Sequence, residues 1–213
     1  MSLPQERVRY TVEEYLEMER ASEVRHEYLD GEIFEMSGES LSHGRICTNI
    51  VISLGNQLKG KSCDVLSKDT KIQSGWLPLP RRMMRGLFSY PDVIVVCGKP
   101  QFHDEYQDIL INPNVIIEVL SDATEKFDRG EKFKRYREHL STLTDYVLVA
   151  QDQPFIDHFS RNESGVWTLV SPTGLESNLQ VASINCTMSL IDIYDRVEFP
   201  IEIDETDESL NAS

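Results

Sequence analysis

The stretch Val115-Ile116-Ile117-Glu118-Val119-Leu120 decides the fold and carries the first clue to the chemistry of this chain. A short apolar run that is rich in β-branched residues and bounded by turn formers is typical of a buried strand. A carboxylate at the centre of such a strand is costly unless a compensating group lies near it. A second run of the same kind, residues 92–96, begins with Asp92 directly after a proline. Two acids on neighbouring strands would indicate a cation between them.

The length of 213 residues fits a single domain, which we predict over residues 1–200. Residues 201–213 contain acids but no base, and we predict a mobile, solvated tail there. No apolar run approaches the ~20 residues that span a bilayer. The N-terminus also lacks the apolar segment of a signal peptide. We therefore expect a cytoplasmic protein that does not contact a membrane.

The net charge of −15 argues against tight, nonspecific binding of nucleic acid, because neutralising phosphates requires Lys and Arg. Positive charge is concentrated locally instead. Arg81, Arg82 and Arg85 form one cluster in a predicted loop over residues 74–89, and residues 119–140 contain another group of bases. A polyanion would have to bind at these places. The arginine cluster is interpreted either as a solvated loop or as an arm that contacts DNA.

The four cysteines are widely spaced and form no C-x-x-C pair. We predict that Cys47, Cys63, Cys97 and Cys186 are reduced, mostly buried thiols. The same spacing argues against a cysteine-based zinc site.

Hydrophobic periodicity and turn residues predict the order of elements. Capping-box spacing predicts a first helix over about residues 11–19, and Asp30-Gly31 predicts the turn of a β-hairpin. Asp128 and Glu131 have a variant of the same spacing, so Asp128 is expected to cap a helix. The other predicted elements are a helix over 43–59, a strand over 63–72, the two acidic strands, a strand over 146–150 and a hairpin over 155–170. This order predicts an α/β or α+β layered domain.

Asp92, Glu118 and a lysine together would suit phosphodiester hydrolysis. Mg²⁺ prefers oxygen ligands and commonly takes only one or two carboxylates from the protein. Such an ion lowers the pKa of a bound water and neutralises a phosphate. A nearby ammonium can position the water or stabilise the charge that develops on phosphate oxygens. The interpretation is a site that binds Mg²⁺ or Mn²⁺ through Asp92 and Glu118.

Pro91-Asp92 followed by Glu118-Val119-Leu120 resembles the PD-(D/E)XK nuclease motif. The wider ordered set resembles the Uma-type restriction endonuclease family, which is abundant in cyanobacteria and was formerly a domain of unknown function. The resemblance covers about residues 10–195. It implies a restriction-endonuclease-like α/β core, with a central mixed β-sheet flanked by helices and an N-terminal helix and β-hairpin as additions. It also implies a Mg²⁺-dependent nuclease that acts on DNA. The residues that carry it are 28–32, His43, Pro91-Asp92-Val93, residues 118–121 and 128–132, Tyr136 and residues 146–149.

One position departs from the motif, because the superfamily lysine two residues after the glutamate is Leu120 here. The resemblance implies that the lysine has moved to the following helix, which makes Lys132 the candidate and Lys126 the runner-up. Three further candidates have structural alternatives. Glu27 is a candidate site acid or a surface residue, His43 a phosphate contact or a neighbour of a helix cap, and Asp128 a site acid or the helix cap.

Two functions of different classes remain open from the sequence. The first is a metal-dependent endonuclease. The second is a catalytically weak or inactive nuclease-fold protein that acts as a DNA- or protein-binding dimeric module. Leu120 and the net charge favour the second, whereas the acid pair favours the first, although Glu118 could instead form a buried ion pair with an arginine. A homodimer is predicted in either case, since a symmetric cleft can present two sites to a duplex.

Overall fold

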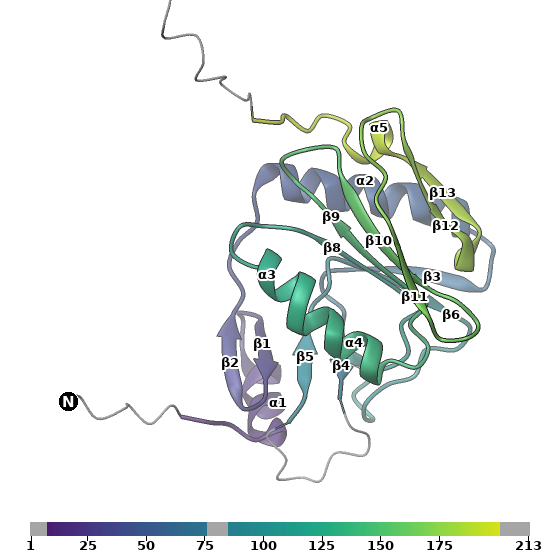
Figure 1. Cartoon of the computed structure of the whole chain (residues 1–213). Coiled ribbons are helices and arrows are strands. Elements are labelled where there is room, and N and C mark those ends of the chain that lie inside the picture. The colour runs from purple at the N-terminus through teal and green to yellow at the C-terminus, as the bar shows by residue number, and fades with distance from the viewer. Residues whose placement is uncertain (1–7, 76–84, 201–213) are drawn as a thin grey trace, which may run out of the picture.

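The computed structural model describes residues 8–75 and 85–200. Its largest element is a six-stranded sheet (Figure 1). The pair β8·β9 is parallel and the other pairs are antiparallel, so the predicted mixed sheet is confirmed. In spatial order the strands are β11 (Trp167–Val170), β10 (Ile156–Arg161), β9 (Asp145–Val149), β8 (Val115–Val119), β6 (Val93–Cys97) and β3 (Cys63–Ser67).

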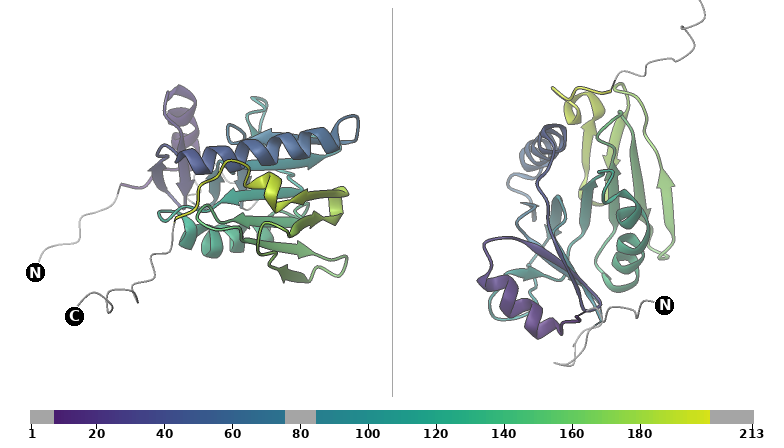
Figure 2. Two further views of the ribbon diagram at one scale, coloured as in Figure 1. Left: turned by 90° about the horizontal axis from the view of Figure 1, so that it is seen from above. Right: turned by 90° about the vertical axis from the view of Figure 1, so that its left-hand side faces the viewer.

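Helices cover both faces of this sheet, as Figure 2 shows for α2 and α4. Alternate side chains of a strand point to opposite faces. Val93 and Ile117 therefore pack against α2 (Leu41–Leu58), whereas Ile94 and Ile116 pack in the core beneath α4 (Phe133–His139). Because both faces are buried, β6 and β8 are apolar throughout except for the acids near their ends. The expected fold class, a central mixed sheet flanked by helices, is confirmed.

A second, five-stranded sheet lies beside the first and contains the predicted hairpin. Helix α1 (Val12–Ala21) covers one of its faces, where Tyr15 stacks on Tyr28 and the ring of Phe88 packs against both at steeper angles. Its other face contributes Ile72 and Leu87 to the core beneath α4. In order the strands are β2 (Glu32–Glu35), β1 (His26–Leu29), β5 (Leu87–Ser89), β4 (Lys71–Ser74) and β7 (Ile109–Leu110).

The C-terminal part of the described chain extends the layer on the α2 side. Leu179 and Met188 belong to the same core as α2, so this part buries apolar side chains that lie beyond the last predicted element. Its elements are β12 (Asn178–Val181), a 3-10 turn (Ala182–Ile184), β13 (Cys186–Ser189) and α5 (Leu190–Ile193).

The first two helices begin and end within two residues of the predicted bounds. Thr11 and Glu14 form the capping box of α1. Ser40 caps α2, its hydroxyl accepting a hydrogen bond from the backbone N–H of His43. Gly60, just past the end of α2, has a φ of +76°, a conformation that favours glycine.

Three local predictions were wrong. Residues 63–72 form not one strand but β3 and β4, which belong to different sheets. The predicted loop over residues 74–89 includes strand β5, while residues 76–84 lie outside the described residues. The helix expected to begin after Asp128 begins earlier, with α3 (Glu125–Phe127) and a π-helical turn (Asp128–Lys132) that lead into α4. The predicted tail over 201–213 also lies outside the described residues.

The prediction of four reduced thiols was wrong for one pair. Cys63 of β3 lies directly opposite Cys97 of β6, and the two form a disulfide. The register of two neighbouring strands creates this contact, so sequence spacing could not reveal it. Cys47 and Cys186 are free and buried, as predicted. Within residues 8–75 and 85–200, no helix is both long and apolar enough to cross a membrane.

Candidate functional site

A pocket of about 780 Å³ opens where the two sheets approach the start of α2 and the π-helical turn. Polar side chains from distant parts of the chain meet in it. Its lining includes six residues singled out from the sequence: Glu27, His43, Asp92, Glu118, Asp128 and Lys132.

Asp92 and Glu118 come from neighbouring antiparallel strands. The outermost residue pair of β6 and β8 at this end is Val93 opposite Ile117, so the register continues to Asp92 beside Glu118. Asp92 Oδ2 accepts a hydrogen bond of 2.7 Å from the backbone N–H of Val119, which joins the two strand ends directly. The two carboxylates enter the pocket from different sides, because Asp92 turns to the start of α2 and Glu118 to the π-helical turn.

Lys132 lies among three carboxylates on the Glu118 side of the pocket. Its Nζ is 2.9 Å from Glu118 Oε1, 3.2 Å from Asp128 Oδ1 and 3.5 Å from Glu27 Oε1. The Lys132 side chain is only 6% exposed and that of Glu118 is 5% exposed. Oδ1 of Asp128 is buried without a hydrogen bond, since the ammonium beside it is not aligned to donate one.

The π-helical turn explains how Lys132 reaches the strand. Asp128 and Lys132 are four residues apart and both are buried on the side that faces the pocket. Asp128 has helical backbone angles and follows α3 directly, so it is not the N-cap that its spacing to Glu131 predicts. Its carboxylate contacts the Lys132 ammonium instead. Such π-helical turns within α-helices occur frequently at functional sites.

Burial and the neighbouring negative charges both raise the pKa of Glu118. Burial raises the pKa of Glu118 well above its ordinary value; the Lys132 ammonium opposes this, while Asp128 and Asp92 add to it. Burial alone would lower the pKa of Lys132, but Glu118 and Glu27 raise it, so the side chain remains an ammonium. The pocket thus holds more carboxylates than the lysines and the arginine that line it can neutralise.

His43 connects Asp92 to α2. Its Nε2 is 2.9 Å from Asp92 Oδ1 and 3.7 Å from Glu39 Oε2. Burial alone would lower the pKa of His43, but the hydrogen bond to Asp92 and the charges of Asp92 and Glu39 raise it. His43 therefore holds one oxygen of Asp92 while the Val119 N–H holds the other.

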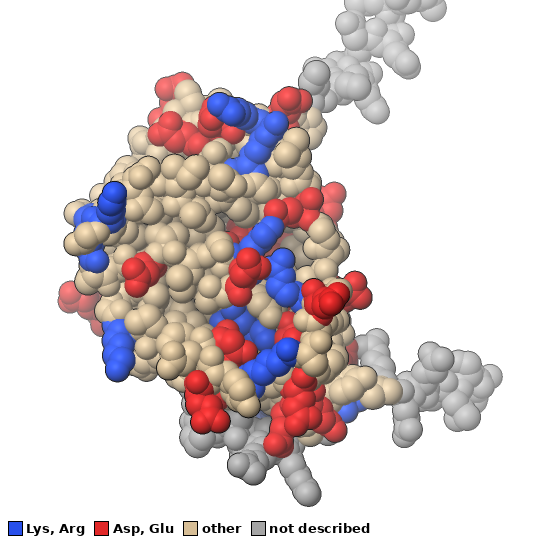
Figure 3. Space-filling model, turned by 180° about the vertical axis from the view of Figure 1, so that it is seen from behind, with Lys and Arg blue, Asp and Glu red and all other residues tan. Residues whose placement is uncertain are grey.

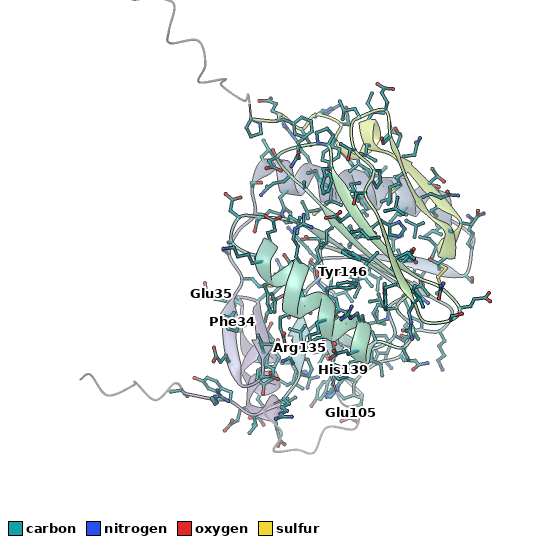
Figure 4. All side chains as sticks on the ribbon, viewed as in Figure 1. Phe34, Glu35, Glu105, Arg135, His139 and Tyr146 are labelled. Atoms are coloured by element: carbon teal, nitrogen blue, oxygen red, sulfur yellow. A yellow bond between two sulfur atoms is a disulfide. The ribbon has the colours of Figure 1, made fainter. Side chains whose placement is uncertain are left out.

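Two networks fix Glu27 and its strand. Oε1 of Glu27 accepts a hydrogen bond from the backbone N–H of Tyr90, and the Tyr90 hydroxyl donates to buried Glu19 at 2.6 Å. Figure 4 shows Arg135 on α4 near the β1–β2 hairpin, and its guanidinium pairs with Asp30 in the hairpin turn. Both contacts hold β1 against the elements that supply Asp92 and Lys132.

Other predicted residues are not brought into the pocket. Lys126 is exposed on α3 and does not line it. Arg85 is exposed near Asp30 and does not line it either, and Arg81 and Arg82 lie outside the described residues. On the face in Figure 3, described Lys and Arg side chains are interspersed with Asp and Glu rather than gathered in one patch.

Several residues of the pocket and its surroundings were missed from the sequence. Tyr136 belongs to the motif set but was not a candidate site residue; it is buried, and its hydroxyl contacts Ser89 at 2.8 Å and Glu118 at 3.4 Å. Glu19 is a buried acid on α1, and Glu39 precedes the cap of α2. The apolar spacing of the α1 face gave the only signal for Glu19, because it falls on the same helical side as Tyr15.

The donor set fits a divalent cation. Seven acidic residues line the pocket, among them Glu27, Asp92, Glu118 and Asp128, against three basic ones, Arg25, Lys68 and Lys132. One buried carboxylate oxygen also lacks a hydrogen bond. Oxygen donors in excess over positive charge are what a hard divalent ion requires. The arrangement can hold such an ion and place an ammonium beside it.

Comparisons with known proteins show the family and the fold of the chain. An uncharacterized protein of Synechocystis, slr1290, is 33% identical over 88% of this chain and 92% of its own length. A second, sll1609, is 28% identical over 80% of this chain and 91% of its own. A crystal structure from Anabaena variabilis, described as "a putative nuclease belonging to DUF820", is 17% identical, with a TM-score of 0.68 over 87% of this chain and 97% of that one. This likeness shows a shared fold. Residues 12–190 match the model of the family described as "Uma2: Putative restriction endonuclease", and the chain therefore belongs to the Uma2 family.

Proposed function

We propose that this protein is a divalent-metal-dependent endonuclease that hydrolyses phosphodiester bonds of DNA. The observation that carries the proposal is that Asp92 and Glu118 stand at facing positions at the ends of neighbouring strands and line one pocket, with Lys132 Nζ 2.9 Å from Glu118. Membership of a family described as restriction endonucleases supports the reaction class.

Asp92 and Glu118 would hold Mg²⁺ or Mn²⁺. A bound ion of this kind supplies Lewis acidity toward a phosphate and lowers the pKa of a coordinated water. Both acids have hydrogen-bond or ion-pair partners that fix their orientation. A side chain held in this way can bind a metal ion without first changing its conformation. For Asp92 these are His43 and the Val119 N–H, and for Glu118 they are Lys132 and Tyr136.

Lys132 would hold the attacking water or a nonbridging phosphate oxygen beside Glu118. Its ammonium is held by three carboxylates in a buried environment, where electrostatic contacts are stronger than in water. Glu27 and Asp128 would act as positioning residues for this ammonium. Asp128 would do so from within the π-helical turn and Glu27 from strand β1.

The test measures cleavage of plasmid, linear duplex and single-stranded DNA with Mg²⁺ or Mn²⁺, at low and physiological salt. The net charge of −15 makes salt a necessary variable, since phosphate contacts weaken as salt rises. Asp92→Asn and Glu118→Gln should abolish cleavage. Glu138→Gln is the matched control, because Glu138 is exposed on α4 and does not line the pocket.

Cleavage that survives in both site variants would overturn the assignment of Asp92 and Glu118. Absence of cleavage on every substrate with both metals would overturn the enzyme and favour the alternative, a nuclease-fold binding module. The position of Leu120 is the observation that favours this alternative. A homodimer remains part of both proposals, and light scattering after gel filtration would test it.

A further inference from the structure

Donor atoms of three chemical kinds lie together at the start of α2. One ligand atom from each of Glu39, His43, Cys47 and Asp92 lies within 4.8 Å of every other. His43 and Cys47 are four residues apart on α2 and so share one side of the helix, and Glu39 comes four residues before His43. Glu118 is not a member of this group, so the group is distinct from the Glu118 and Lys132 side of the pocket.

Contacts from outside the group orient its two carboxylates. Oδ2 of Asp92 accepts from the Val119 N–H, which leaves Oδ1 turned to His43 Nε2 at 2.9 Å. Oε1 of Glu39 is paired with Lys68 Nζ, which leaves Oε2 turned to the same imidazole nitrogen at 3.7 Å. Outer contacts of this kind fix the orientation of metal ligands and raise metal affinity.

The chemistry of the donors selects the ion. A hard ion such as Mg²⁺ prefers oxygen ligands only, whereas a thiolate and an imidazole suit Zn²⁺ and related transition metals. Zn²⁺ commonly takes four ligands from Cys, His and carboxylates, at about 2.0–2.3 Å. Cys47 is 9% exposed, so its sulfur is sheltered from solvent beside the other three donors. The spacing of the cysteines argues against a cysteine-based zinc site, and in this group three of the four donors are not cysteines.

We propose that Glu39, His43, Cys47 and Asp92 form a second cation site, of the zinc class. It goes beyond the proposed nuclease function and does not depend on it. Asp92 belongs to both sites, whereas Cys47 belongs only to this one and Glu118 only to the magnesium site. Cys47 and Glu118 therefore separate the two proposals.

The experiment titrates Co²⁺, a spectroscopic substitute for Zn²⁺, into the full chain under anaerobic conditions without added thiol. A cysteine ligand gives a thiolate-to-cobalt charge-transfer band in the near ultraviolet. We expect this band in the wild-type protein, its loss in Cys47→Ser, and its persistence in Cys186→Ser and in Glu118→Gln. Cys186 is the matched control, because it is the other free, buried cysteine. Competition with Zn²⁺ should then give a stoichiometry of one ion per chain. His43→Ala should bind that ion at least ~10-fold more weakly, since removing even an outer-shell partner of a metal ligand lowers metal affinity by about this factor.

A second measurement covers the case in which Cys47→Ser does not fold. Zn²⁺ should slow alkylation of Cys47 in the wild-type protein and leave that of Cys186 unchanged, as read by peptide mapping. The proposal is overturned if saturating Co²⁺ gives no charge-transfer band, if the band survives in folded Cys47→Ser, or if Zn²⁺ fails to protect Cys47. Loss of the band in Glu118→Gln would also overturn it, because the ion would then lie at the magnesium site.

Discussion

Lys132 Nζ lies 2.9 Å from Glu118 Oε1, so the ammonium reaches this carboxylate from the π-helical turn and not from the strand itself. The strand position two residues after Glu118 is filled by Leu120, which is buried with Phe133 and Tyr136 beneath α4. The apolar side chain helps to hold the helix that supplies Lys132. A leucine at the strand position is thus compatible with a lysine ammonium beside Glu118, because the helix supplies that ammonium.

Glu118→Gln is expected to keep the fold and remove the response to Mg²⁺ or Mn²⁺. The amide has the same shape, and Lys132 retains Asp128 and Glu27 as partners. We expect a change in the free energy of unfolding of about 1 kcal/mol or less. The wild-type melting temperature should rise with the metal, since the ion binds the native state, and that of the variant should not. An unfolded variant would make Glu118 a structural ion-pair partner instead.

Lys132→Met is expected to abolish cleavage and destabilise the protein while leaving metal affinity nearly intact. Removing one partner from a buried ion pair typically costs roughly 3–5 kcal/mol, because the remaining carboxylates are left unpaired. Urea unfolding and DNA cleavage measure the two effects. Lys126→Met is the control, and since Lys126 is exposed it should change the free energy of unfolding by only ~0.5 kcal/mol. Cleavage that survives in Lys132→Met but not in Lys126→Met would reverse the assignment of the lysine.

Glu19→Ala is expected to weaken the packing of α1 against the strands next to the site and so to lower the stability of the protein. The Glu19 carboxylate accepts hydrogen bonds from the His26 backbone N–H and the Tyr90 hydroxyl, and its Oε1 lies 3.8 Å from buried Lys71. Loss of these contacts leaves buried donors unpaired, so we expect a loss of roughly 3–5 kcal/mol in unfolding free energy. Glu19→Gln should lose less. The exposed residue Glu17 on the same helix provides the control, and a Glu17→Gln variant as unstable as Glu19→Ala would contradict the assignment.

Asp145 is expected to contribute acid-sensitive stability. Burial alone would raise the pKa of Asp145, but hydrogen bonds involving His158 and Ser183 lower it below its ordinary value. A pKa lower in the folded than in the unfolded protein gives stability that is fully present above the unfolded value of about 3.9. This stability is lost as pH falls through the folded value. Asp145→Asn should therefore reduce the urea midpoint near neutral pH and make its decline in acid less steep. Asp152→Asn, at an exposed position, should follow the wild-type profile.

The cross-strand disulfide is expected to stabilise the sheet and to leave two titratable thiols. Without reductant, only Cys47 and Cys186 should react with a thiol reagent in denaturant. The bridge closes a loop with a sequence separation of 34, so the chain-entropy model gives about 3–4 kcal/mol for its removal. The Cys63→Ser/Cys97→Ser double variant measures this by urea unfolding. Four reactive thiols in the wild-type protein would show that the pair is reduced.

Local sequence patterns correctly predicted the elements that depend mainly on neighbouring residues. The capping box of α1, the Asp30-Gly31 hairpin and the buried strands around Asp92 and Glu118 follow from short-range periodicity and turn chemistry. Residues 63–72 were assigned to one strand because both halves have strand composition. Sheet membership depends on partners far away in the sequence, so no local pattern could divide them into β3 and β4.

The sequence by itself determined that two carboxylates stand in or beside buried strands, because alternation and burial depend only on neighbouring residue types. It also identified the lysine-bearing segment after the second strand. Only the tertiary structure decided that Lys132 rather than Lys126 meets Glu118, that Asp128 contacts this lysine instead of capping a helix, and that Cys47 lies beside His43 and Asp92. Asp128 and Lys132, like His43 and Cys47, are only four residues apart, but each pair meets an acid from another element, Glu118 or Asp92. The packing of α2 and α4 on opposite faces of one sheet, shown in Figure 2, creates these contacts.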